Sequence, residues 1–173
     1  ALEPRIHDSW LDAYTQYAQY QEAPSIFHLW NGISLIAGVL GRDAYIKFGY
    51  GRLYPNLYTV LVSPAGKSKK TSSANIGVHN FLQKVDGVRI LTPKTTPEGL
   101  ITYLNLSPVT KVGATYDKVC TAFLYAPELA SMLGKQSYVS SLVNYLTDLF
   151  DCPNTWDDVT RTGLNKKDTI KLQ

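Results

Sequence analysis

The chain has 173 residues, of which 45% are hydrophobic and 18% charged, so its length and composition favour one globular domain with a hydrophobic core. Lys and Arg number 17 and Asp and Glu number 14, and the resulting net charge of +3 is too small to identify a nucleic-acid-binding protein. Its two cysteines, Cys120 and Cys152, lack the spacing of metal ligands, which argues against a zinc site.

The first 53 residues predict two helices and a hairpin. Apolar residues recur at three-to-four spacing over residues 8–21, which predicts an amphipathic helix. Pro24 breaks that pattern, and a second helix is predicted from about Ser25 to Leu40, with Gly41 as its C-terminal stop. Aromatic and β-branched residues then flank a glycine-rich turn at Gly49–Gly51, which predicts a hairpin or two strands.

A strand, a basic turn and a helix are predicted next, in that order. The run YTVLV at Tyr58–Val62 is continuously apolar, which is typical of a strand buried on both faces of a parallel sheet. The turn SPAGKSKKT occupies Ser63–Thr71, and the apolar pattern that follows it predicts a helix. Gly77 lies inside this helix, where glycine costs about 1 kcal/mol relative to alanine.

Strands and helices continue to alternate over the remaining residues. Val88–Leu91 predicts a short strand, and a helix is predicted to begin at Thr96. Val119–Ala126 is a third apolar run, and Tyr138–Phe150 predicts an amphipathic helix. The ending TIKLQ predicts one more strand. This alternation predicts an α/β fold with a mainly parallel sheet.

The turn Ser63–Thr71 has the features of a phosphate-binding loop. Such a loop needs converging backbone N–H groups, a helix N-terminus and a cation within reach, and its usual string is GxxxxGK[ST] after a strand. The string is degenerate here, and two alignments of it compete. If Gly66–Ser68 ended the motif, the loop would begin at Leu61, inside the predicted strand. If the motif runs from Pro64 to Thr71, the helix begins at Lys70 and the loop has room.

We prefer the second alignment, in which Lys70 reaches the β- and γ-phosphates of ATP and the Thr71 hydroxyl binds Mg²⁺. Gly66 would let the backbone approach the phosphates, whereas Pro64 and Lys69 replace the glycines of the usual string. The alternative is a basic surface turn that begins a helix and binds nothing. The predicted nucleotide-binding residues are Pro64, Ala65, Gly66, Lys67, Ser68, Lys69, Lys70, Thr71 and Ser72.

Glu128 is the candidate acidic residue of the site. P-loop enzymes need a carboxylate at the end of a neighbouring strand to hold Mg²⁺ or to orient a water molecule. Glu128 directly follows FLYAP, where Ala126 and Pro127 stand in place of the usual Asp. We therefore expect Glu128 and Lys70 to be the catalytic residues, and Glu128 and Thr71 to bind the metal. The alternative for Glu128 is a structural residue stabilised by the positive end of a helix.

Five segments together resemble a known family. They are IFHLWNGISLIAGVLGR, LYPNLYTVLVSPAGKSKKTSSANI, TPEGLI, FLYAPELASML and YLTDLFDCPNTWDDVTRTG. The chain resembles a family of bacterial, phage and prophage P-loop proteins of unknown function, described as primase- or helicase-like and similar to RecA-type ATPases. The resemblance extends from about Phe27 to Lys171, and YPNLY and LTDLFDCP are its most distinctive parts.

The resemblance implies an N-terminal helical and hairpin segment at residues 1–52 and a partial RecA-like P-loop NTPase core at residues 53–173, truncated at its C-terminus. It implies an ATP- and Mg²⁺-dependent motor that acts on DNA as a homo-oligomeric ring. The alternative is a module of the same fold that binds nucleotide or nucleic acid without hydrolysis. The sequence shows no signal-peptide pattern and no long apolar run, so we expect a cytoplasmic protein, of a bacterium or its host, without a membrane partner.

Overall fold

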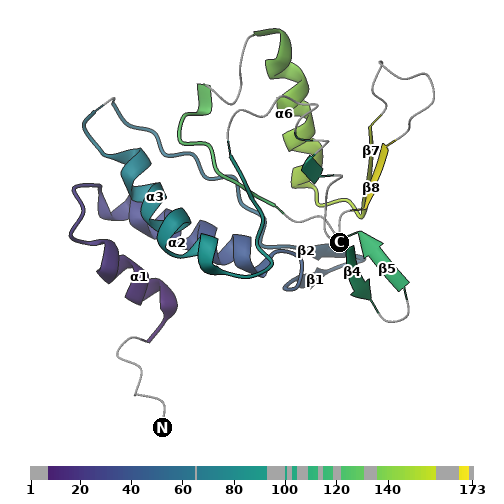
Figure 1. Ribbon diagram of the computed structural model, residues 1–173, viewed down its shortest axis with the longest axis horizontal. Helices are drawn as coiled ribbons and strands as arrows, with labels where there is room; N and C mark the ends of the chain where they lie inside the picture. The colour runs from purple at the N-terminus through teal and green to yellow at the C-terminus, as the bar shows by residue number, and fades with distance from the viewer. Residues whose placement is uncertain are drawn as a thin grey trace. The chain divides into compact units, whose positions relative to one another are not determined.

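The computed structural model describes residues 8–64, 66–92, 100, 103–104, 109–112, 115–118, 122–130, 136–158 and 168–171. The chain forms two compact units, and Figure 1 draws both. Unit 1 comprises Ala1–Leu40 with Leu57–Val88, and unit 2 comprises Gly41–Asn56 with Arg89–Gln173. The predicted start of a helix at Thr96 falls outside the described residues.

Unit 1 is built from the helices α1 (Trp10–Ala18), α2 (Ser25–Leu40) and α3 (Lys70–Asn80), followed by a short 3₁₀ turn, η1 (Leu82–Lys84). All three helices were predicted, and α2 has the predicted bounds. Gly41, which follows α2, has a φ of +49°, a backbone conformation that suits a helix stop at glycine. The first helix begins after Ser9, whose Oγ accepts a hydrogen bond from the Asp12 N–H at 3.1 Å.

Two glycines allow the three helices of unit 1 to approach one another closely. A Cβ atom on Gly32 of α2 would lie 2.6 Å from Leu11 Cδ1 of α1. A Cβ atom on Gly77 of α3 would lie 2.7 Å from Leu35 Cδ1 of α2 and 3.0 Å from the Tyr14 hydroxyl of α1. The low helix propensity of Gly77 is therefore offset by the close packing that its missing side chain permits.

Four aromatic side chains pack together where α1 meets the end of α3. Trp10 stacks on Tyr14 with ring centroids 5.2 Å apart. Phe81, just after α3, makes edge contacts with Trp10, Tyr14 and Tyr17 at 5.4–5.9 Å between centroids. Burial raises the pKa of Tyr14 to about 12. These contacts join the first helix to the end of α3.

The segment before α3 differs from the prediction. Residues 54–64 have no strand assignment, and Tyr58, Val60 and Val62 are exposed, Val62 by 81%. A strand requires a neighbouring backbone to pair with, and no described residue pairs with this segment. The segment is instead tied to α2, because the hydroxyls of Thr59 and Ser34 lie 2.8 Å apart.

Unit 2 contains the predicted hairpin and a parallel strand pair. Strands β1 (Ile46–Phe48) and β2 (Gly51–Leu53) are antiparallel, and Gly49 at their turn has a φ of +57°. Strands β3 (Ile90–Leu91) and β6 (Phe123–Leu124) pair in parallel within the regions predicted as the second and third strands. The helix α6 (Gln136–Phe150) contains the whole predicted amphipathic helix. The buried core consists of Leu91, Leu100, Leu104 and Leu142.

Two further antiparallel pairs in unit 2 were not predicted as pairs. Strand β4 (Val109–Val112) pairs with β5 (Thr115–Lys118), and β7 (Thr155–Asp158) pairs with β8 (Asp168–Lys171). The last strand contains the TIK of the predicted TIKLQ strand. Over the described ranges, the sheets are therefore four two-stranded pairs, one of them parallel, in place of the larger, mainly parallel sheet that we expected.

Arg42 joins the hairpin region to the C-terminal end of α6. Its Nη1 donates to the carbonyl oxygens of Cys152 and Pro153 at 3.1 and 3.0 Å. Its Nη2 donates to the Tyr54 hydroxyl at 3.2 Å, and this hydrogen bond lowers the pKa of Tyr54. Asn56 adds a 2.7 Å hydrogen bond from its Nδ2 to the Phe150 carbonyl. Asn56 thus contacts the carbonyl of the last residue of α6, and Arg42 contacts two carbonyls just beyond the helix.

Candidate phosphate-binding loop

The helix α3 begins where the second alignment predicted, whereas the strand that was predicted to end at Val62 is absent. The helix begins at Lys70, so the residues from Ser63 to Lys69 form the connection to it. Gly66 has a φ of +75°, and nothing lies within 4 Å of the place where a Cβ would be. Lys69 also has a positive φ, +45°, which is uncommon for a residue with a side chain. Ala65 lies outside the residues that the structure describes.

The Lys70 side chain folds back onto the start of the loop. Its Nζ donates to the Ser63 carbonyl oxygen at 2.7 Å and contacts the Ser63 hydroxyl at 2.9 Å. Lys70, the first residue of α3, is therefore bonded to Ser63, the first residue of the loop.

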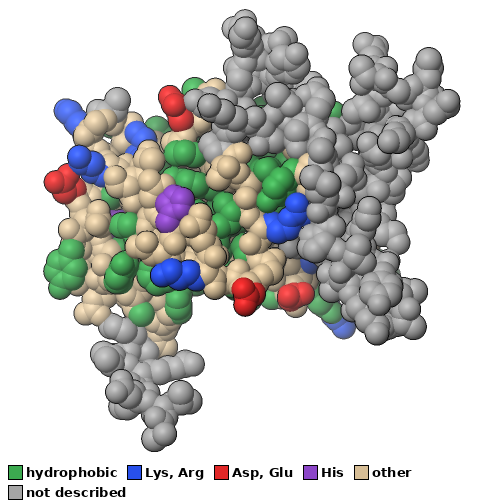
Figure 2. Space-filling view, viewed as in Figure 1, with side chains coloured by type: hydrophobic (Ala, Val, Ile, Leu, Met, Phe, Trp, Pro, Cys, Tyr) green, Lys and Arg blue, Asp and Glu red, His purple; other side chains and the backbone are tan. Residues whose placement is uncertain are grey.

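The N-terminus of α3 has the polarity that favours an anion. The N–H groups in the first turn of a helix have no partners within the helix, and aligned peptide dipoles give this end a partial positive charge. Lys69 at the N-cap makes no capping hydrogen bond through its side chain, since an ammonium group cannot accept one, and the first turn has no acidic residue. Basic side chains gather over this loop in the space-filling view, with an acidic one beside them (Figure 2). The acidic partner of Lys69 is Glu22, at 3.5 Å between Nζ and Oε2.

Helix α2 supports both ends of the loop through two polar side chains. Asn31 Nδ2 donates to Ser73 Oγ at 3.2 Å, and Ser73 Oγ donates to the Lys70 carbonyl oxygen at 2.7 Å. Ser73 is fully buried, so this chain of hydrogen bonds fixes the first turn of α3 from inside unit 1. Ser34, three residues after Asn31, holds Thr59 on the other side of the loop. The sequence did not lead us to predict this support. The signal in the sequence is the pair of polar residues Asn31 and Ser34, three positions apart in a largely apolar helix.

The remaining predicted loop residues are open to solvent to different degrees. Pro64, Lys67, Thr71 and Ser72 are exposed, whereas Ser68 is half-buried. No hydrogen bond or ion pair involves Lys67 in the described part of the chain. In the first alignment, Lys67 would be the lysine at the start of the helix. The helix begins later, at Lys70, so Lys67 does not occupy that place.

Glu128 lies in unit 2, whereas Thr71 lies in unit 1. Glu128 is exposed at a bend four residues after Leu124, the end of β6. The strand before it, β6, pairs in parallel with β3. Over the described ranges, no group of three or more His, Cys, Asp or Glu residues could hold a metal ion.

Comparison of the chain with known proteins found no matching family model, no matching curated protein and no matching solved structure. None of the helices in the described ranges has the length and apolar character needed to cross a membrane.

Proposed function

We propose that the Ser63–Thr71 loop binds the phosphate groups of ATP, and that the chain belongs to a P-loop ATPase of a phage, mobile-element or replication system. The observation that carries this proposal is the closure of the loop by Lys70, whose Nζ bonds to Ser63 across the start of α3. A nucleotide would replace Ser63 as the partner of the ammonium group. Its phosphate oxygens would also accept hydrogen bonds from the first-turn N–H groups.

The residues present fit a bound nucleotide. Gly66 leaves open space beside the backbone, and three lysines and a helix N-terminus supply positive charge without an acidic residue in the first turn. Mg²⁺ would arrive with the phosphates and add the Thr71 hydroxyl to its ligands. Glu128 is our candidate for the residue that orients the attacking water, in a DNA helicase- or translocase-like motor that works as a ring.

A binding experiment with the native chain and two variants tests the proposal. ATP with Mg²⁺ is titrated into the native chain, Lys70→Ala and Lys67→Ala, with Tm measured for each. Loss of a charge-assisted contact costs about 1.5–3 kcal/mol, so Lys70→Ala should bind about 10- to 100-fold more weakly. Lys67→Ala is the comparison within the loop: it removes the same charge but not the contact to Ser63, so it should weaken binding less than Lys70→Ala. Equal binding by Lys70→Ala and the native chain would contradict our alignment of the motif.

Hydrolysis separates the two functions that we consider. In the ATPase, Glu128→Gln should keep ATP binding and lose turnover, and retained turnover would exclude the proposed role of Glu128. The second function is a module that binds nucleotide or nucleic acid without hydrolysis, which the missing strand-end Asp favours. Binding without turnover by the native chain would identify that module. DNA binding that weakens steeply with salt would support a DNA partner in either case.

A further inference from the structure

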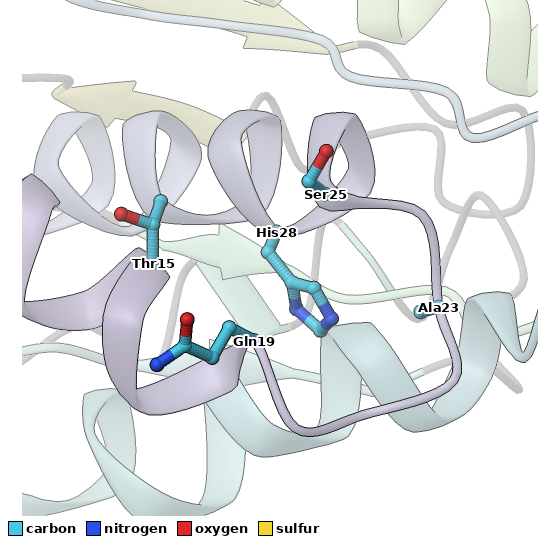
Figure 3. A pocket seen from close by; sticks show the side chains of 5 residues that line it. All are labelled: Thr15, Gln19, Ala23, Ser25 and His28. Atoms are coloured by element: carbon cyan, nitrogen blue, oxygen red, sulfur yellow. The ribbon is translucent and has the colours of Figure 1, made fainter.

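A cavity of about 110 Å³ lies in unit 1, away from the phosphate loop's own residues. Its lining comes from α1, the α1–α2 connection and the start of α2, and Figure 3 shows the residues concerned: Thr15, Gln19, Ala23, Ser25 and His28. The His28 ring projects from α2 into the space between Gln19 and Ala23 (Figure 3). The cavity is therefore an opening between two packed helices with an imidazole at its inner end.

His28 is buried without a hydrogen-bond partner. Its side chain is 2% exposed, and neither Nδ1 nor Nε2 has a partner in the described part of the chain. Buried polar groups are almost always hydrogen-bonded, because losing water without replacing it is unfavourable. A ring with both nitrogens unpaired beside a cavity makes that cavity a candidate site for a hydrogen-bonding partner.

The lining of the cavity is polar but uncharged. Burial lowers the pKa of His28, so its ring is neutral at pH 7, with one nitrogen that donates and one that accepts. The Thr15 hydroxyl donates within its own helix, to the carbonyl oxygen of Leu11 or of Asp12 at 3.0 Å, which leaves it free to accept. The side chains of Gln19 and Ser25 make no hydrogen bond to any described residue.

We propose that this cavity binds the hydrogen-bonding edge of a nucleobase, with a base N–H donating to a His28 ring nitrogen and an adjacent base acceptor facing Gln19 or Ser25. A charged ligand is disfavoured, because none of the five lining side chains would neutralise it. The cavity is smaller than the roughly 150 Å³ that holds benzene, so only the edge of a ring enters. The rest of the base extends past Gln19 and Ser25, which are exposed.

The base could come from a free nucleoside or from a nucleotide held by the phosphate loop. The second source is supported by the proximity of the cavity lining to the loop. Glu22 belongs to the connection that lines the cavity, and its carboxylate lies 3.5 Å from Lys69 Nζ in the loop. The cavity itself does not depend on the loop, and the two sources differ in their response to Lys70→Ala. That variant should weaken ATP binding and leave nucleoside binding unchanged.

The test is an NMR titration of the ¹⁵N-labelled chain, observed at the imidazole nitrogens. The probes are uridine and adenosine, acetamide as the bare amide group, and acetate as its charged counterpart. We expect at least one nucleoside to shift the His28 nitrogens in a saturable manner, acetamide to do so more weakly, and acetate to have no such effect. Shifts absent with every probe would overturn the proposal and leave ordered water as the occupant of the cavity.

Two variants make the result specific to His28. His28→Leu should bind the nucleoside at least tenfold more weakly, whereas His28→Gln keeps a donor and an acceptor and should bind better than His28→Leu. The matched control is His79→Gln, because His79 is exposed on α3, and its affinity should equal that of the native chain. Equal affinity of His28→Leu and the native chain, or tighter binding of acetate than of acetamide, would refute the site. If the nucleosides bind and ATP does not, the result supports the nucleobase site and contradicts the proposed phosphate-binding loop.

Discussion

Gly77→Ala should destabilise unit 1, although alanine is the better helix former. Replacing a glycine inside a helix by alanine gains about 1 kcal/mol of helix propensity. The new Cβ would lie 2.7 Å from Leu35 Cδ1, about 1 Å inside the normal carbon–carbon contact distance. Leu35 and Tyr14 are 4% and 1% exposed, so neither side chain can move out into solvent. Overpacking costs about 1–3 kcal/mol, which makes a net loss of about 1 kcal/mol the expected result.

The assay is urea-induced unfolding followed by tryptophan fluorescence, because Trp10 stacks on Tyr14 inside unit 1. Leu35→Ala is the second substitution of a double-mutant cycle, because it removes the methyl group that clashes with the new Cβ. Alone, Leu35→Ala should lower the free energy of unfolding by about 2–5 kcal/mol. In that background, Gly77→Ala should stabilise the protein. Gly51→Ala is the control, since its Cβ would lie 3.6 Å from the Phe48 carbonyl oxygen, an ordinary contact. An equal effect of Gly77→Ala in both backgrounds would refute the steric argument.

Two further predictions concern backbone strain and pH. Lys69→Gly should raise the free energy of unfolding by up to about 1 kcal/mol, because a left-handed φ of +45° costs a residue with a side chain about 1–2 kcal/mol and the greater freedom of glycine in the unfolded chain offsets about 0.5–1 kcal/mol of that. Lys67→Gly should not raise it, and a loss of stability in Lys69→Gly would contradict the strain that we assign. Burial lowers the pKa of His28 in the folded state below its ordinary 6.5. At pH values between these two pKa values, His28 is more protonated in the unfolded chain than in the folded chain. Stability should therefore fall as pH drops below about 6.5, by at most about 1.4 kcal/mol per pH unit. Urea unfolding at several pH values should show that His28→Leu loses this slope and His79→Gln keeps it.

Local sequence patterns predicted the elements whose causes are local. The bounds of α2 follow from its apolar periodicity and from Gly41, and the hairpin follows from the turn at Gly49–Gly51. The start of α3 at Lys70 followed from the length of chain that a loop needs. Long-range partners could not be predicted in this way: Asn31 and Ser73, which hold the loop, are 42 residues apart. The same limit applies to Tyr58–Val62, because an apolar run does not say whether another strand pairs with it.

The two most distinctive parts of the sequence resemblance meet at Arg42. Tyr54 and Asn56 come from YPNLY, and Phe150 and Cys152 from LTDLFDCP. Arg42 donates to the Tyr54 hydroxyl and the Cys152 carbonyl, while Asn56 donates to the Phe150 carbonyl. These contacts therefore link Arg42, Tyr54 and Asn56 to the C-terminal end of α6 and the two residues that follow it. Cys152 and Phe150 take part through their backbone carbonyls, so the contacts explain packing and not catalysis. The proposal of ATP binding rests on the loop before α3, where Lys70 contacts Ser63, and the Lys70→Ala titration tests it.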